Sequence, residues 1–277
     1  MRIDSHQHFW KYDPIRDSWI TDEMSAIRKD FLPAELKKVY EENKVQGCVA
    51  VQADQSEKET AFLLRLAEEN DFIKAVVGWV DLKSATVEER LLHYSGLKKI
   101  KGFRAITQGQ PDDTYLLNKD FHRGIRLLQQ FGFTYDVLIY HYQLTAAIKF
   151  TEKFPDQGFV LDHLGKPDIR NREIKKWIAG LKILAQHPKL FCKLSGIITE
   201  ADWKNWTYND IYPYLETAAE YFGVERLMYG SDWPVCLVAG KYKQVIEIIE
   251  KFLEQVNDEE KEKVWGKNAI QFYNLAI

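Results

Sequence analysis

The sequence has few cysteines, and their spacing excludes several classes of protein. Its 277 residues contain only Cys48, Cys192 and Cys236, and no two of them have the C-x-x-C spacing of a zinc ribbon or a redox motif. Each lies among apolar neighbours, which favours buried free thiols over a disulfide or a thiolate site. We therefore expect a protein of a reducing compartment, namely the cytoplasm.

An excess of one charge and long apolar runs are also missing. The formal net charge is −3 with acids and bases interspersed, so the sequence shows no basic surface for a nucleic-acid partner. No apolar run approaches the roughly 20 residues of a membrane-spanning helix, and the N-terminus lacks the basic start and apolar stretch of a signal peptide. We expect a globular protein that binds neither nucleic acid nor a membrane. Its oligomeric state stays open, and a homo-oligomer is possible on this sequence.

What the sequence does have is eight short apolar segments separated by stretches of helical periodicity, clearest over 56–70, 209–223 and 241–256. Near-continuous apolar runs are typical of parallel strands buried on both faces. No Gly-rich phosphate loop follows any of them, which argues against a doubly wound open sheet. We therefore predict an α/β fold, a single (β/α)8 TIM barrel domain over residues 1–277. The expected strands are residues 2–9, 45–52, 73–82, 100–106, 133–140, 158–165, 190–197 and 226–234.

The first expected strand carries two histidines one residue apart, in the segment DSHQHFW (4–10). Residues two apart in a strand point to the same face, so Asp4, His6 and His8 are predicted to project together. Active sites of barrels form at the C-terminal ends of the strands. Two imidazoles at that rim would suit a metal ion or a polarised substrate.

Polar residues end most of the other expected strands as well. They are Gln52, Arg104, Asp136, His163, Lys193, Ser195 and Asp232. For Asp136 and Lys193, a structural ion pair is an equally good interpretation. His141 follows the fifth strand and can reach the rim, whereas His93, His122 and His187 are expected on the surface.

Three segments carry a family resemblance: DSHQHFW (4–10), LDHLGKPDI (161–169) and MYGSDWPV (228–235). Together they resemble the amidohydrolase superfamily, and more narrowly the sugar lactonases of its amidohydrolase-2 branch, which act on L-fucono- and L-rhamnonolactones. VQADQSEKET (51–60) and CKLSGIITEADW (192–203) are similar too. The resemblance implies a hydrolase of carbohydrate catabolism that opens the ester ring of a sugar-derived lactone, the small-molecule partner we expect.

The resemblance also implies roles for the rim residues. Asp232 would be the base that activates water, and His163 and Arg104 would polarise the carbonyl. His6, His8 and Asp232 would be the ligands of one divalent metal ion, with zinc favoured and a metal-free enzyme as the alternative. Superfamily members with two metals have a bridging lysine or carboxylate on strand four and a histidine on strand five. Arg104 and Asp136 stand there instead, which argues against a second ion. The expected substrate-binding residues are Lys166, Trp203, Gln52 and Asp136.

Two other functions stay open on the same residues. A metal-dependent decarboxylase of an aromatic or dienoic acid would use the same H-x-H pair and Asp232, with Arg104 and Lys166 neutralising the carboxylate. A barrel that binds a sugar or an acid without turnover is the third possibility. We further expect the segment 195–210, after strand seven, to form a lid in which at least one of Trp203 and Trp206, with Trp203 favoured, faces the pocket. The alternative is a short helix over residues 200–207 whose tryptophans only pack against the barrel rim.

Overall fold

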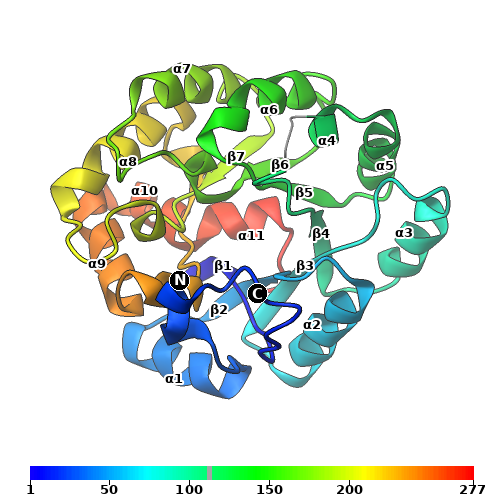
Figure 1. Cartoon of the computed structure of the whole chain (residues 1–277), viewed down its shortest axis with the longest axis horizontal. Coiled ribbons are helices and arrows are strands. Elements are labelled where there is room, and N and C mark those ends of the chain that lie inside the picture. The colour runs from blue at the N-terminus through cyan, green and yellow to red at the C-terminus, as the bar shows by residue number, and fades with distance from the viewer. Residues whose placement is uncertain (111–113) are drawn as a thin grey trace.

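The computed structural model describes residues 1–110 and 114–277, and in this part of the chain eight parallel strands follow one another in the order β1 to β8. Figure 1 shows the strands gathered inside a ring of helices. Each strand lies within a predicted segment, so the prediction of a (β/α)8 barrel is confirmed. The strands are β1 Ile3–Gln7, β2 Gly47–Val51, β3 Ile73–Gly78, β4 Ile100–Arg104, β5 Thr134–Val137, β6 Phe159–Leu161, β7 Leu190–Lys193 and β8 Leu227–Met228.

Backbone hydrogen bonds beyond the regular ladder join the first and last strands. The amide of His8 donates to the carbonyl of Trp233 at 2.7 Å, and the amide of Asp232 donates to the carbonyl of His6 at 2.8 Å. The chain after β8 therefore runs beside β1. Closure of the barrel itself brings together the first and last segments that the sequence marked as functional.

Helices cover the outside of the barrel (Figure 1). The three predicted from periodicity are present as α2, α8 and α9, although the last ends earlier than expected. Local capping explains two of the boundaries: Ser56 Oγ accepts a hydrogen bond from the Glu59 amide at the start of α2, and Gly223 follows α8 with φ 67°. No helix among the described residues is long and apolar enough to cross a bilayer. The α-helices are α1 Pro33–Asn43, α2 Glu57–Glu69, α3 Val87–Ser95, α4 Thr114–Leu117, α5 Lys119–Gln130, α6 Leu144–Thr151, α7 Lys175–Leu184, α8 Tyr208–Phe222, α9 Tyr242–Phe252, α10 Asp258–Glu262 and α11 Asn268–Phe272.

The apolar core has two parts. The larger part lies between the strands and the surrounding helices. The smaller part is inside the barrel, where strand residues such as Val49, Val77 and Met228 pack against Tyr273. Tyr273 follows α11, a helix that contacts β1 and β8 and crosses the middle of the ring in Figure 1. The C-terminal segment therefore contributes to the inside of the barrel.

An irregularity in β1 corrects the prediction for Asp4. The register against β2 shifts between Asp4 and Gln7, so the simple alternation of faces is broken there. The Asp4 carboxylate accepts hydrogen bonds from Tyr40 of α1 and Tyr242 of α9, each at 3.0 Å, and thus faces the helices. The expectation that Asp4 shares a face with the two histidines was wrong, because a bulge cannot be read from residue spacing.

Candidate active site

The main pocket opens at the C-terminal ends of the strands and has a volume of about 400 Å³. Its polar residues come from the ends of strands one, four, six and eight and from the loops that follow strands four to seven. Apolar side chains form much of the remaining wall. The polar lining residues are His8, Arg104, Gln108, Tyr140, His163, Lys166, Thr199, Glu200 and Asp232.

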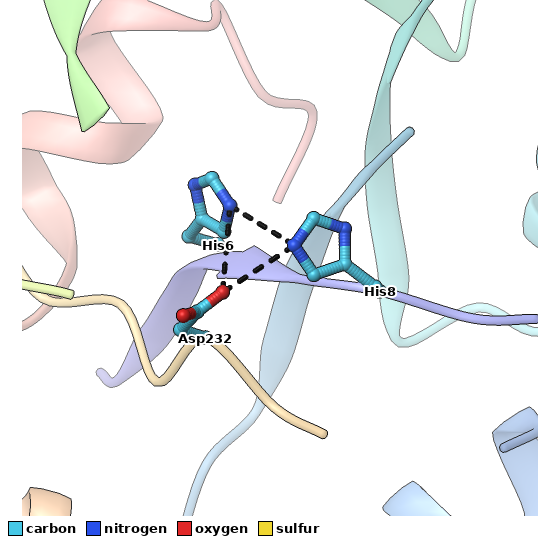
Figure 2. Close-up of side chains that lie close together, drawn as sticks. All are labelled: His6, His8 and Asp232. Atoms are coloured by element: carbon cyan, nitrogen blue, oxygen red, sulfur yellow. Dashed lines mark hydrogen bonds and ion pairs between the residues drawn. The ribbon is translucent and has the colours of Figure 1, made fainter. Parts of the chain in front are cut away.

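Four of the predicted residues converge on one point. Asp232 Oδ1 lies 3.4 Å from His8 Nε2, 3.9 Å from His6 Nε2 and 4.0 Å from His163 Nε2. The two Nε2 atoms of His6 and His8 are 3.2 Å apart, and Figure 2 shows these side chains and Asp232 pointing toward one another. All four residues are buried.

The hydrogen-bond partners constrain the protons of the two strand-one histidines. His8 Nδ1 lies 2.7 Å from the carbonyl of Val51, which only accepts, so Nδ1 carries a proton and the neutral imidazole has its lone pair on Nε2. His6 has a donor-only group near each ring nitrogen: Arg104 Nη1 lies 3.2 Å from Nε2, and Lys193 Nζ lies 3.1 Å from Nδ1. When the His6 proton is on Nδ1, which lies 3.3 Å from Asp162 Oδ1, the lone pairs of both Nε2 atoms and a carboxylate oxygen converge on one point.

Burial holds His6 and His163 neutral, and neighbouring groups hold the Asp232 carboxyl ionised. Burial raises the pKa of Asp232, but the neighbouring His163, His8 and His6 outweigh that effect and keep its pKa below the ordinary value. Burial lowers the pKa of His163 to about 4, although Asp232 and Asp162 oppose the shift. Burial also lowers the pKa of His6 well below its ordinary value. Near neutral pH the site therefore holds an anion beside the neutral imidazoles of His6 and His163.

Backbone conformation at the site is unusual at two of these residues. His163 and Asp232 have φ of 54° and 58°, in the left-handed region that non-glycine residues rarely adopt. Such conformations persist where the surrounding structure enforces them, commonly at functional sites. Gly196 makes the position of His163 possible: a Cβ there would lie 2.5 Å from His163 Nδ1.

Arg104 is fixed at the edge of the pocket. Its Nη1 forms an ion pair with Asp162 Oδ2 at 3.0 Å, and its Nη2 donates to the carbonyl of Gln52. Gln52 Nε2 in turn donates to the Arg104 carbonyl at 3.1 Å. Gln52 is fully buried and is not among the residues that line the pocket. The structure therefore places Gln52 behind Arg104 rather than in the pocket wall.

Asp136 also lies below the pocket rather than in its wall. Its Oδ2 accepts a hydrogen bond from Lys193 Nζ at 2.5 Å and another from the Tyr273 hydroxyl at 2.9 Å. Lys193 Nζ also lies 2.9 Å from Asp162 Oδ1 and 3.1 Å from His6 Nδ1. The substrate-binding placement of Asp136 is corrected: it sits in a buried ion network, the alternative that the sequence left open for Asp136 and Lys193.

Lys166 and Glu200 form the polar side of the pocket. Lys166 Nζ lies 3.3 Å from Glu200 Oε1 and 5.4 Å from the centre of the Tyr140 ring. Burial raises the pKa of Glu200, and Lys166 opposes that shift. His141 lies behind this pair, with Nδ1 at 3.1 Å from the Lys166 carbonyl.

The loop after β7 places its two tryptophans differently. Trp203 lines the pocket and donates its indole N–H to the Thr199 carbonyl at 2.8 Å. Trp206 donates to the carbonyl of Ala239 at 2.8 Å and is not among the lining residues. No α-helix forms between residues 200 and 207.

Sequence reasoning missed the apolar wall contributed by the segment after β1, which brings Trp10, Trp19 and Met24 to the pocket.

Two histidines expected on the surface are buried instead. His122 Nε2 lies 2.7 Å from the Leu116 carbonyl, and His187 Nε2 lies 3.2 Å from the Phe154 carbonyl. His122 packs against the ring of Phe154, and His187 packs against the ring of Phe159 in β6. The prediction was wrong because an imidazole whose N–H meets a carbonyl is readily buried.

Comparisons with known proteins agree with this geometry. The profile of a family described as amidohydrolase matches residues 3–275. An L-fucono-1,5-lactonase of Burkholderia multivorans is 38% identical over 286 residues, which cover 99% of this chain and 96% of the relative. An L-fucono-1,5-lactonase of Burkholderia ambifaria is 32% identical, with the same coverage. A crystal structure of a Burkholderia multivorans amidohydrolase with bound zinc superimposes with a TM-score of 0.97 at 38% identity, over the full length of both chains.

Proposed function

Because the chain belongs to the amidohydrolase family, and because four buried polar groups converge at its barrel rim, we propose that it hydrolyses sugar-derived lactones. The similarity to two L-fucono-1,5-lactonases over 99% of the chain makes lactones of deoxy sugars, and L-fucono-1,5-lactone first, the proposed substrates. The convergence of His6, His8, His163 and Asp232 is the observation that carries the proposal.

Ring opening requires a base, a polarised carbonyl and a proton for the leaving oxygen. We assign the base to Asp232, which is ionised and faces the pocket. Its low pKa makes it a weak base, so the carbonyl must be well polarised; a lactone, as an activated ester, makes this easier than an amide would. Asp232 then returns the proton to the departing ring oxygen.

His163 and Arg104 supply the polarisation in this mechanism. His163 Nδ1 lies 2.9 Å from the Ser195 hydroxyl; when Ser195 donates, the imidazole proton is on Nε2, directed toward the pocket. Arg104 adds a permanent positive charge at the same rim. Both groups would stabilise the negative charge that develops on the carbonyl oxygen. Lys166 and Glu200, with Trp203 opposite a sugar face, would hold the hydroxyl groups of the ring.

His6, His8 and Asp232 also fit a divalent metal ion. Ligand atoms bound to zinc at about 2.0–2.2 Å with tetrahedral angles lie roughly 3.3–3.6 Å apart, close to the separations of 3.2 and 3.4 Å that His8 Nε2 makes with the other two ligand atoms. When bound, such an ion would act as a Lewis acid toward the carbonyl. We propose that at most one ion binds and that turnover does not require it.

The decarboxylase alternative has weaker support, since the similar relatives are lactonases. A screen with a pH indicator separates the two functions. Five- and six-membered aldonolactones, supplied with and without a chelator, should release acid above the spontaneous rate. No acid release from any lactone, together with carbon dioxide release from an aromatic or dienoic acid, would contradict the proposed function.

We also propose a cytoplasmic location, supported by three cysteines that are all unpaired and buried.

A further inference from the structure

The lone pair of His6 that a metal ion would use already has a cationic partner. Arg104 Nη1 lies 3.2 Å from His6 Nε2, the same atom that lies 3.2 Å from His8 Nε2 and 3.9 Å from Asp232 Oδ1. A neutral imidazole nitrogen has one lone pair, and a guanidinium group can only donate. Coordination of an ion by His6 would therefore require this hydrogen bond to break.

Arg104 has little freedom to move away. Its side chain is 4% exposed, Nη1 is paired with Asp162 Oδ2 at 3.0 Å, and Nη2 donates to the Gln52 carbonyl. Asp162 is itself held by Lys193 Nζ at 2.9 Å. Because an arginine keeps its charge at any working pH, a dication bound to His6 would sit beside a fixed positive charge in a poorly solvated place.

We propose that Arg104 is a metal-excluding residue: its guanidinium group occupies the His6 side of the ligand set and weakens the binding of zinc at His6, His8 and Asp232. The part that concerns catalysis rests on the lactonase function proposed above, in which Arg104 then provides the positive charge that a metal ion would otherwise supply. The part that concerns zinc affinity is independent of any substrate.

Lys166 offers a matched control for charge. Lys166→Met and Arg104→Met each remove one positive charge from a residue that lines the same pocket. Lys166 Nζ is paired with Glu200 rather than with His6. A difference in zinc affinity between the two variants therefore reports the contact with His6 and not the net charge of the pocket.

The experiment is titration of zinc into the chelator-stripped full-length protein, by calorimetry or by competition with a chromophoric chelator, without substrate. Arg104→Met should bind zinc at least about tenfold more tightly than the wild type, and Lys166→Met should change the affinity much less. Adding His8→Ala to Arg104→Met should abolish the gain, which assigns the ion to this ligand set. If Arg104→Met does not fold, Arg104→Gln replaces it, since glutamine keeps a hydrogen-bond donor without the charge. The same gain in zinc affinity is expected.

Unchanged or weaker zinc binding by both Arg104 variants would overturn the proposal, as would an equal gain in Lys166→Met. For catalysis, the stripped wild type should keep its lactonase turnover while Arg104→Met loses it despite tighter zinc binding. A stripped wild type that is inactive until zinc is added would overturn the catalytic part alone. Failure of every preparation on every lactone would instead contradict the proposed function and leave the affinity result standing.

Discussion

The hydroxyl of Ser231 donates a 2.6 Å hydrogen bond to the carboxylate of Asp4, across 227 residues of sequence. The backbone amide of Ser231 donates to the other carboxylate oxygen at 2.8 Å. Asp4 precedes His6 by two residues, and Ser231 directly precedes Asp232. One buried carboxylate thus ties the two segments that bear the converging groups.

Ser231→Ala should therefore lower kcat/KM by about tenfold, because the Asp232 segment loses one of its two bonds to Asp4. A hydrogen bond to a charged group contributes about 1.5–3 kcal/mol, so a lower melting temperature is expected as well. Tyr242→Phe is the control: it removes a 3.0 Å bond to the same carboxylate oxygen, but from α9. Kinetics and thermal unfolding of both variants check this. Equal losses of kcat/KM in the two variants would contradict a particular role of the Ser231 bond in positioning Asp232.

Asp232→Asn should remove nearly all turnover, because the amide cannot accept the proton of the attacking water. A general base contributes a factor of about 10² to 10⁴. The measurement is kcat on a lactone that the wild type hydrolyses, with Asp258→Asn as a control at a carboxylate whose side chain is 96% exposed. If Asp232→Asn retains more than about a tenth of the activity, another residue is the general base, and His163 is the next candidate.

Gly196→Ala should damage the site more than the fold. The new Cβ would lie 2.5 Å from His163 Nδ1, and φ at Gly196 is 64°, so the change adds a clash to backbone strain. Gly223→Ala separates the two effects, because φ there is 67° and nothing lies within 4 Å of the new Cβ. The positive φ should cost each variant on the order of 1–3 kcal/mol of stability, and only Gly196→Ala should lose about a hundredfold or more in kcat/KM. Normal kinetics in Gly196→Ala would show that His163 need not hold this position.

On the acid side of its pH profile, kcat/KM should begin to fall only near pH 4. His163 must be neutral in the proposed mechanism, and burial lowers its pKa to about 4, so the rate falls only as the pH drops through that value. Asp232, with its pKa below the ordinary value, stays ionised over this range. A rate profile from pH 3.5 to 8, corrected for spontaneous hydrolysis, tests this. An acid limb near 6.5, the value of a solvated histidine, would be inconsistent with the buried neutral imidazole.

Trp203→Ala should lower kcat/KM with little change in melting temperature, because its ring lines the pocket. Trp206→Ala should show the reverse, since its indole bonds to the Ala239 carbonyl outside the pocket lining. Kinetics and thermal unfolding of the pair distinguish a substrate contact from packing. If both variants unfold more easily and keep their turnover per folded molecule, the loop after β7 has a structural role only.

The strands and their order were predictable because parallel strands buried on both faces appear as short apolar runs, and polar residues at their ends stand out. Position along a strand was harder to predict. Arg104 and Asp136 pair in register between β4 and β5, yet Arg104 reaches the pocket and Asp136 pairs with Lys193 beneath it. The spacing of residues along a strand indicates which face each side chain occupies. The depth of a side chain inside the barrel depends instead on the shear and tilt of the strands, which are properties of the whole barrel.

Other parts of the site depended on contacts that no local pattern encodes. The bulge that turns Asp4 toward α1 and α9 arises where β1 pairs with β2, so it depends on both strands. The apolar wall from Trp19 and Met24 belongs to an irregular segment after β1, without the periodicity that identifies helices and strands. The sequence marks Glu200 only as one of the acids in the segment after strand seven, and its pairing with Lys166 depends on the path of that loop.

The bond from the Tyr273 hydroxyl to Asp136 has a consequence for protein synthesis. Translation proceeds from the N-terminus, and a domain generally folds as a unit. Tyr273 comes after β8, so a growing chain that has delivered all eight strands still lacks the donor that completes the Asp136, Lys193 and Asp162 network under His6 and Arg104. Assembly of the catalytic end therefore depends on the last residues of the chain, and a truncation that removes Tyr273 while keeping all eight strands would leave Asp136 without this donor.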